Sequence, residues 1–428
     1  MTILINIIGI MVVICGLYLF SSNKKNIDKK MILKALVLQF ILTFLLVKFP
    51  LGRIGIQKVS DVVTNVLSYG REGLNFVFGS LSNSNAPTGM IFGISVLGNI
   101  IFISALVAAL YYLGIIGAVV KVIGGAIGKV LGTSKVESFV AVANMFLGQT
   151  ESPILVSKYL PGMSESEIML VLISGMGSMS ATVLMGYAGM GIPMEYLLIG
   201  GALVPLGSII VSKILLPENK KEELANIKED ITNVDDTLIE AEIAEPIATE
   251  IVCDEVTIDN KGDNANLISA ISQGANDGLN MALGIGASLI AIISLVALVN
   301  GALGAVGLSL EKILSYVFYP LGFLMGLDKA EIFTASQLLG SKLVLNEFVA
   351  FGQLGQIING LDYRAGLMMT ISLCGFANIS SMGICISGIS VFCPEKRNQL
   401  AKLAFRGMIG GFLVSLLSAL IVGAVVAI

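Results

Sequence analysis

The sequence predicts an all-α polytopic membrane protein with about eight transmembrane helices, two re-entrant helical hairpins in an inverted repeat, and interfacial helices. Three observations lead to this fold class. The 428 residues are 55% hydrophobic and only 13% charged, whereas a soluble domain carries about 25% charged residues. Several apolar runs reach the roughly 20 residues with which a helix crosses a bilayer. Two further stretches, one in each half of the chain, are apolar but broken by polar residues.

Eight apolar runs are the candidates for the spanning helices. The first, "ILINIIGIMVVICGLYLF", has no basic residue before it and no small-residue cleavage site after it. We therefore interpret it as a retained helix and not as a signal peptide. Between the second and third runs, helical periodicity with scattered charge predicts interfacial helices. The runs cover residues 3–20, 31–49, 89–119, 166–190, 194–216, 277–306, 363–392 and 403–428.

An acidic segment separates the two halves. Fifteen of the 30 acidic residues lie between Glu218 and Asp263, among few aromatic residues and without a sustained apolar stripe. Such a composition predicts a solvated, flexible loop. The lysine-rich segments "SSNKKNIDKK" and "PEKRNQLAK" favour the cytoplasm. We therefore expect a multi-pass protein of the cell membrane with both termini outside and the acidic loop in the cytoplasm.

The sequence lacks histidine and any metal-binding spacing of cysteines. Its five cysteines also form no CxxC pair. Histidine is the commonest general base and the commonest metal ligand. The composition therefore argues against a membrane enzyme and gives no sign of an organic cofactor.

The two broken stretches run from about residue 135 to 160 and from about 329 to 360. Each predicts two half-helices joined by a polar tip, which a membrane allows only where the tip is buried in protein or lines a cavity. After each come a helix with a Gly/Ser-rich middle and a further apolar helix, and an odd number of crossings in between inverts the second copy. Inverted repeats with broken helices are typical of secondary transporters. The predicted parts are N-terminal scaffold and interfacial helices (1–134), the first repeat of a transport domain (135–216), the acidic loop (217–265), a scaffold helix with interfacial segments (266–328) and the second repeat (329–428).

Each repeat places one acid in an apolar setting, Glu151 and Glu347. A carboxylate at membrane depth costs several kcal/mol, about 3 on insertion scales, and by default marks a substrate or ion pathway. An internal salt bridge between Lys342 and Glu347 is the structural alternative. Because ionised carboxylates only accept hydrogen bonds, two of them would suit a cation or a neutral ligand that is rich in hydroxyl groups.

Other polar residues extend both tips. Amide and hydroxyl groups that both donate and accept are present at Gln149, Thr150, Asn346 and Asn378, and Phe376 offers an aromatic face. Ser152 before Pro153 predicts a helix start at the first tip. The segments "NMFLG" and "GSMS" supply Asn and Ser oxygens of the kind that a small hard cation such as sodium prefers.

The motifs "GQTESPILV", "GSKLVLNEFVAF" and "CGFANISS" resemble signatures of concentrative nucleoside transporters, and the resemblance runs from about residue 91 to the C-terminus. It implies a homotrimer of eight-helix protomers in the lipid bilayer. It also implies a mobile transport domain that carries one nucleoside with a co-transported cation, and no nucleic acid partner. A secondary transporter for another small polar solute is the alternative.

The resemblance also implies positions for the ligands. The tip "GQTESP" resembles sodium-coupled members, so sodium is the expected coupling ion and the proton is the alternative. Gly148 corresponds to acceptance of purines as well as pyrimidines, which favours broad specificity. The implied nucleoside-binding residues are Gln149, Thr150, Glu151 and Val183 on the base side, Glu347, Asn378 and Ser381 on the ribose side, and Phe376 along the pocket. The implied sodium ligands are Asn144, Leu147, Ser178 and Met179, through side chains or backbone carbonyls.

Overall fold

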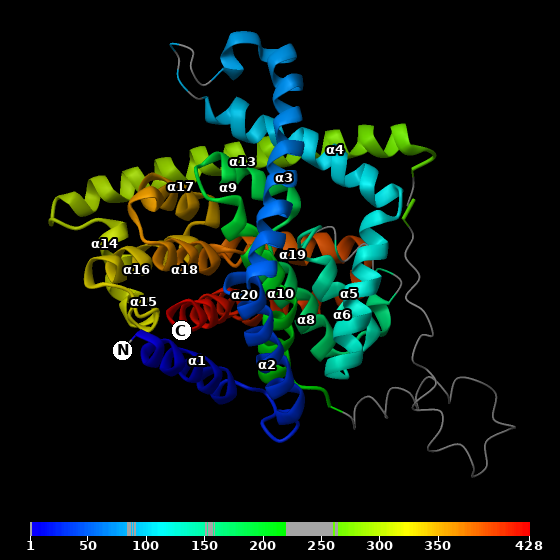
Figure 1. The fold of residues 1–428 in the computed structure, drawn as a ribbon, viewed down its shortest axis with the longest axis vertical. Helices are drawn as coiled ribbons and strands as arrows, with labels where there is room; N and C mark the ends of the chain where they lie inside the picture. Colours follow the sequence, from blue (N-terminus) through cyan, green and yellow to red (C-terminus); the bar gives the residue numbers. More distant parts are fainter. Residues whose placement is uncertain are drawn as a thin grey trace, which may run out of the picture.

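The computed structural model describes residues 2–83, 87, 89, 91–149, 152, 157, 159–219, 260–261 and 264–428. Within these ranges the regular elements are helices, without a strand (Figure 1). The acidic loop lies mostly outside the described residues. The helices are α1 (Thr2–Leu19), α2 (Lys29–Val47), α3 (Pro50–Phe78), α4 (Gly98–Tyr112), α5 (Ile115–Leu131), α6 (Lys135–Ala143), α8 (Glu165–Gly177), α9 (Ala181–Gly189), α10 (Met194–Leu215), α13 (Leu267–Gly304), α14 (Leu310–Val317), α15 (Tyr319–Leu324), α16 (Lys329–Val344), α17 (Glu347–Ile357), α18 (Tyr363–Leu373), α19 (Ile379–Phe392) and α20 (Arg397–Ala427).

The predicted spanning segments are found as helices. Seven segments of the described chain are long and apolar enough to cross a membrane: α1, α2, a π-helical turn with α4, the pair α8 and α9, α10, α13, and α20 with the turn before it. The eighth predicted run, residues 363–392, is divided into α18 and α19. The polytopic all-α fold is therefore confirmed.

Two predicted boundaries are wrong. The run at 89–119 is not one helix, because Gly114 adopts φ 76° and α5 begins directly after it. Helix α13 begins at Leu267, ten residues before the apolar run, with the Asn266 side chain accepting from Ser269 N at 2.9 Å. The polar residues near its start lower the hydropathy but do not break the helix, because their backbone groups still bond within it.

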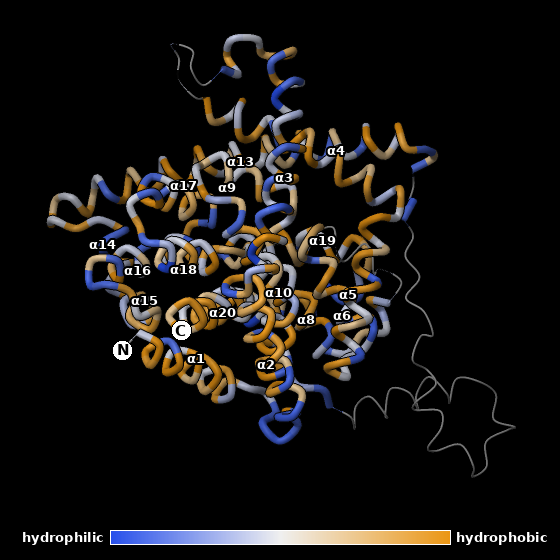
Figure 2. The backbone as a smooth tube through the Cα atoms, viewed as in Figure 1, coloured by the Kyte–Doolittle hydropathy of each residue, from blue (hydrophilic) through white to orange (hydrophobic). Residues whose placement is uncertain are grey.

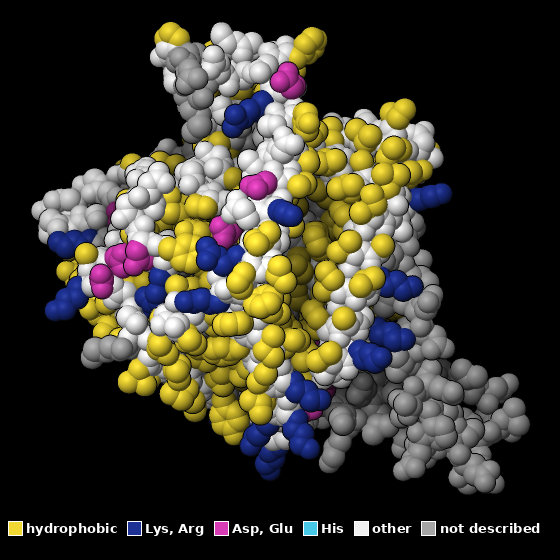
Figure 3. All heavy atoms as spheres, viewed as in Figure 1, with side chains coloured by type: hydrophobic (Ala, Val, Ile, Leu, Met, Phe, Trp, Pro, Cys, Tyr) yellow, Lys and Arg dark blue, Asp and Glu magenta, His cyan; other side chains and the backbone are white. Residues whose placement is uncertain are grey.

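Apolar helices lie both at the centre and at the surface. Helices α8, α10 and α20 pack on one another and are buried around most of their circumference (Figure 1). In contrast, α13 exposes large side chains such as Ile290 and Leu298, each 72% exposed. The residues in both places are mostly hydrophobic (Figure 2), and apolar side chains cover much of the face shown in Figure 3. A surface of this kind suits contact with lipid.

Two helix breaks meet at the centre of the molecule. The chain is extended at Ser178 between α8 and α9, and it is interrupted again between α18 and α19. Phe376 N donates to Ser178 O at 3.2 Å, which joins the two breaks. Gly375 adopts φ 104°, and a Cβ there would lie 2.7 Å from Gly177 O. Only glycine allows this close approach, so the two halves of the chain touch where their helices are broken.

The second hairpin consists of α16 and α17. Asn346 begins α17 as its N-cap, with the side chain accepting from Val349 N at 2.9 Å. The first hairpin begins with α6, and much of its second arm lies outside the described residues. The division into scaffold and transport domain stays a prediction.

Candidate binding site between the broken helices

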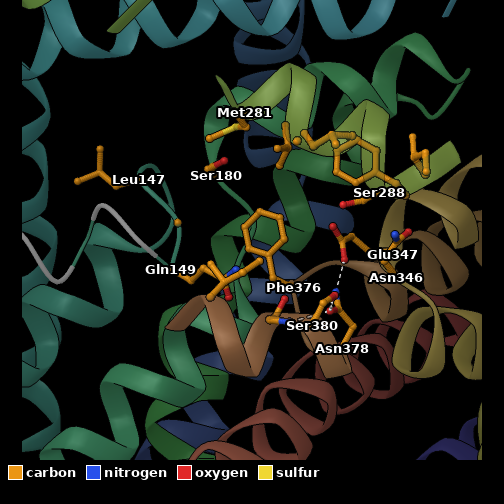
Figure 4. Close-up of a pocket in the computed structure, with 18 residues that line it drawn as sticks. Leu147, Gln149, Ser180, Met281, Ser288, Asn346, Glu347, Phe376, Asn378 and Ser380 are labelled. Atoms are coloured by element: carbon orange, nitrogen blue, oxygen red, sulfur yellow. Dashed lines mark hydrogen bonds between the residues drawn. The ribbon is translucent and has the colours of Figure 1, made fainter. Parts of the chain in front are cut away.

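A cavity of about 400 Å³ lies beside the two helix breaks (Figure 4). Its volume is in the range of small-molecule pockets, roughly 300 to 1,000 Å³. Both halves of the chain contribute to its walls, together with one side of α13. The lining residues are Leu147, Gly148, Gln149, Ser180, Val183, Met281, Gly284, Ile285, Ser288, Leu289, Asn346, Glu347, Phe348, Phe376, Asn378, Ser380, Ser381 and Ile384.

Glu347 is the acidic residue of this cavity. It is the first residue of α17 and is only 4% exposed. Asn378 Nδ2 donates to one carboxylate oxygen at 2.7 Å, and the Tyr187 hydroxyl donates to the other at 3.4 Å. The positive end of the α17 dipole also favours a negative charge at this position. The carboxylate is therefore held by neutral donors, and these leave part of its acceptor capacity unused, because an ionised carboxylate offers about four lone-pair sites.

Asn378 has its amide orientation fixed by its own helix. It is the N-cap of α19, and its Oδ1 accepts from Ser381 N at 2.9 Å and from the Ser380 hydroxyl at 2.7 Å. Because the oxygen serves these two donors, the NH2 group must point to Glu347. Asn378 thus caps α19 and orients Glu347 through one continuous set of hydrogen bonds.

Tyr187 was not among the residues that the sequence predicted. Its ring stacks on Phe351 with centroids 4.2 Å apart and contacts Phe348 at 4.9 Å. The residue is fully buried. It lies one helical turn after Val183, which the resemblance placed in the site, so the i, i+4 spacing on one helix face could have indicated it.

Gln149 lies on the opposite side of Phe376 from Glu347 and Asn378 (Figure 4). It is 8% exposed, and its Oε1 accepts from the Cys385 thiol at 3.3 Å. Gly148 before it adopts φ 82° and lies so close to α9 that an added Cβ would be 2.8 Å from Ser180 Cβ. The cavity therefore has an amide end and a carboxylate end, with an aromatic ring between them.

Comparison with known proteins now identifies the family. The family model "Na+ dependent nucleoside transporter C-terminus" matches residues 196–423, the corresponding N-terminus model matches 8–81, and a "Nucleoside recognition" model matches 93–194. The chain belongs to the family of Na+-dependent nucleoside transporters. Members of this family are transporters and not enzymes, which agrees with the absence of histidine and confirms the resemblance seen in the motifs.

Individual relatives extend over nearly the whole chain. The nucleoside permease NupC of Helicobacter pylori is 36% identical over 98% of this chain and 97% of its own length. An uncharacterized transporter of Haemophilus influenzae is 36% identical over 99% and 98%. A solved structure described as CNTnw in an inward-facing substrate-bound state has a TM-score of 0.87 at 33% identity, covering 100% of this chain and 98% of that one. The fold of the transporter is therefore shared along its full length.

The structure brings most of the predicted nucleoside residues to one cavity. Gln149, Val183, Glu347, Phe376, Asn378 and Ser381 all line it. Thr150 and Glu151 lie outside the described residues. The sequence did not predict the wall formed by α13, which includes Met281 and Ser288 (Figure 4). The part of α13 that lines the cavity, from Met281 to Leu289, contributes mainly apolar surface and therefore carries no polar motif.

The alternative interpretation, a salt bridge between Lys342 and Glu347, is wrong. Lys342 Nζ instead donates to Ser372 O at 3.0 Å, Cys374 O at 2.8 Å and the Ser415 hydroxyl at 2.6 Å. Among the described residues, the buried ion pairs are those of Lys213. Contact with Lys342 consequently does not neutralise the carboxylate of Glu347.

The four residues implied as cation ligands are all buried, each at most 5% exposed: Asn144, Leu147, Ser178 and Met179. Asn144 Oδ1 accepts from the Ser152 hydroxyl at 2.7 Å and lies 3.9 Å from the position of a Cβ on Gly175. The Ser178 hydroxyl donates to Gly175 O at 3.0 Å. The two polar side chains therefore lie around the last turn of α8.

The chemistry of this group fits a small monovalent cation. Its members supply amide, hydroxyl and carbonyl oxygens, which hard cations prefer. Across the described ranges, no group of three or more His, Cys, Asp or Glu residues is arranged to hold a metal ion. Such neutral ligands suit sodium better than a divalent metal, which usually requires carboxylates.

Proposed function

We propose that this transporter imports nucleosides by symport with sodium, through alternating access of a transport domain. The observation that carries the proposal is the unit formed by Glu347, Asn378 and the start of α19, which faces a cavity of nucleoside size. Its carboxylate is bonded by an amide at 2.7 Å and by a phenol at 3.4 Å. A neutral ligand that bears hydroxyl groups can donate to the remaining lone pairs of this carboxylate.

The cavity offers different chemistry to the two halves of a nucleoside. On the ribose side, Glu347 accepts hydrogen bonds while Asn378 and Ser381 complete the polar wall. On the base side, Gln149, Val183 and Phe376 line the cavity, and by sequence Thr150 and Glu151 belong to the same tip as Gln149. Because the resemblance links a glycine at position 148 with acceptance of purines as well as pyrimidines, we expect acceptance of both classes of nucleoside.

Sodium would bind at Asn144, Leu147, Ser178 and Met179. This group lies next to the base-side tip, since a Cβ on Gly175 would be 3.2 Å from Gln149 Cβ and 3.9 Å from Asn144 Oδ1. A cation that orders the segment from Asn144 to Ser152 would also fix Gln149. Binding of the ion and of the nucleoside would then stabilise the same conformation, which is the condition for coupling.

Alternating access and assembly also belong to the proposal. Solved structures similar to this chain are described as inward-facing and as outward-facing, with TM-scores of 0.87. The exposed apolar face of α13 suits burial in a homotrimer within the cell membrane. Both termini would lie outside, with the lysine-rich turn between α1 and α2 in the cytoplasm.

Uptake of radiolabelled uridine into proteoliposomes tests the function. We expect accumulation that requires an inward sodium gradient and that unlabelled purine and pyrimidine nucleosides inhibit. Accumulation driven equally by a proton gradient in sodium-free buffer would replace sodium by the proton. Uptake of an amino acid without any uptake of uridine would overturn the assignment of the substrate.

A further inference from the structure

Lys342 is a buried lysine that no carboxylate of the described residues contacts. It lies in the last turn of α16 and is 0% exposed. Its ammonium donates three hydrogen bonds, to the carbonyls of Ser372 and Cys374 and to the hydroxyl of Ser415, at 2.6 to 3.0 Å. The ring of Phe412 lies 5.6 Å away on the same helix as Ser415. All three donors of the ammonium are therefore satisfied by neutral oxygens.

These oxygens form a site of the kind that binds a monovalent cation. The carbonyls of Ser372 and Cys374 belong to the C-terminal end of α18, where the unpaired C=O groups and the helix dipole present negative charge. A buried ammonium is expensive unless such groups compensate it. The C-terminal end of α18 thus binds the ammonium of Lys342, a cation that is covalently part of the protein.

A comparable place exists in the first repeat. There, Asn144 caps the first hairpin helix, and its amide donates to the Ser174 hydroxyl at 2.9 Å, in the last turn of the broken helix α8. In the second repeat, Lys342 at the end of the first hairpin helix reaches Ser372 in the last turn of the broken helix α18. Each hairpin therefore contacts the end of the broken helix that follows it, once through a neutral amide and once through an ammonium.

The sequence of the two hairpins agrees with this difference. Residues 136–150 contain no lysine or arginine before Glu151, whereas Lys342 precedes Glu347 by five residues. We propose that the ammonium of Lys342 is a built-in cation that performs, at the break of the second repeat, the task that a sodium ion performs at the break of the first. This inference rests on the proposed function, and it implies that one sodium ion accompanies each nucleoside.

Lys342 also connects to the nucleoside cavity. Its acceptor Cys374 begins the segment that carries Phe376 and Asn378, and both of these line the cavity. By holding the Cys374 carbonyl at 2.8 Å, the ammonium fixes the start of the segment that orients Asn378 toward Glu347. Lys342 is therefore a positioning residue on the ribose side, and it does not contact the nucleoside.

Two variants separate a cationic role from simple packing. In Lys342→Ala the three oxygen atoms that accept from the ammonium remain, but the ammonium is removed. A sodium ion from solution can then bind between these oxygen atoms. We expect uridine binding to weaken about tenfold or more at low sodium, to recover at high sodium, and the Hill coefficient for sodium to rise from about 1 toward 2. In Lys342→Met the side chain fills the space, so binding weakens without recovery and the Hill coefficient stays near that of wild type.

The measurement is calorimetric titration of uridine into the purified full-length protein over a series of sodium concentrations, with choline as the replacement ion. Lys396→Ala is the matched control, since Lys396 also donates to a carbonyl, Met163 O at 2.9 Å, outside the cavity; it should behave as wild type. A folded Lys342→Ala protein with an unchanged Hill coefficient would overturn the inference.

A measurement on the wild type covers the case in which the variants do not fold. Uptake at a series of membrane potentials gives the number of sodium ions per uridine, and a value of two would refute the inference while leaving sodium symport intact. Failure of the proposed function itself has a different signature, because wild-type binding would then be independent of sodium and Asn144→Ala would change nothing.

Discussion

Two buried acids of the molecule, Glu137 and Glu347, have contrasting surroundings. Both are at most 5% exposed, and each belongs to a helix of a hairpin. Glu137 forms an ion pair with Lys213, which also contacts Glu218 at 2.5 Å. Glu347 is bonded only to neutral groups among the described residues and faces a cavity.

The difference shows which acid is available to a ligand. An ion pair uses the charge of its carboxylate for structure, and removing one partner of a buried pair costs about 3 to 5 kcal/mol. In this transporter the pair joins α6 to α10. A carboxylate that is oriented by neutral donors keeps its charge and can accept further hydrogen bonds. Burial alone therefore does not identify a functional acid, whereas the partners of the acid do.

The largest expected effect is the loss of uridine affinity when Glu347 is replaced by glutamine, and the same replacement at Glu137 is the comparison. Glu347→Gln keeps the shape but removes the charge, so we expect uridine affinity to fall by about one to two orders of magnitude. Glu137→Gln should leave the affinity unchanged and lower the melting temperature, because Lys213 loses part of its compensation. Calorimetry and thermal unfolding of the full-length protein measure both quantities.

An analogue without the 3′-hydroxyl sharpens this prediction. It should bind weakly to the wild type and lose little more in Glu347→Gln, since the lost contact is the same one. If Glu347→Gln binds uridine as tightly as the wild type, the two acids do not differ in function and both are structural.

A smaller effect is expected at the neutral cation site. Asn144→Ala removes one oxygen ligand and should raise the half-saturating sodium concentration by about tenfold, while uridine affinity at saturating sodium is kept. Asn300→Ala is the control, because Asn300 bonds Glu311 at 3.0 Å beyond the cavity. An unchanged sodium dependence in Asn144→Ala would place the ion elsewhere.

The hydroxyl of Tyr187 should contribute less. Tyr187→Phe removes one donor to Glu347, at 3.4 Å, but keeps the stacked ring, so uridine should bind roughly three- to tenfold more weakly. Tyr196→Phe removes the hydroxyl from a ring that packs edge-on against Tyr363 with centroids 5.6 Å apart, and it should have no effect on binding. Equal losses in the two variants would mean that the contact with Glu347 is not the cause.

The smallest effect is expected from the acidic segment. Shortening it within residues 224–255 should leave uptake unchanged, because its composition provides few groups that could pack or bind a neutral ligand. Glu218 must be kept, since it contacts Lys213 of the ion-pair cluster; losing it should lower stability and not affinity. Loss of uridine binding by a shortened but folded protein would contradict this prediction.

Sequence patterns determined the helical membrane fold and most members of the cavity. Apolar runs reveal spanning helices because a bilayer requires a minimum helix length, and polar residues in an apolar setting reveal sites because burying them is costly. The motifs around Gln149, Glu347 and Asn378 therefore indicate residues that line the cavity. The same patterns did not determine local boundaries, as Gly114 and the polar start of α13 demonstrate, because a glycine or a polar residue can either break a helix or be tolerated in it.

Only the tertiary structure decided which groups are partners. Tyr187 and Glu347 are 160 residues apart in the chain, and Cys385 and Gln149 are 236 apart. Lys342, five residues from Glu347, bonds instead to the end of α18 and to a hydroxyl of α20. The hydrophobic pattern of the sequence shows which segments avoid water. Hydrogen bonds between helices depend on distance and direction, which are set only when those helices pack.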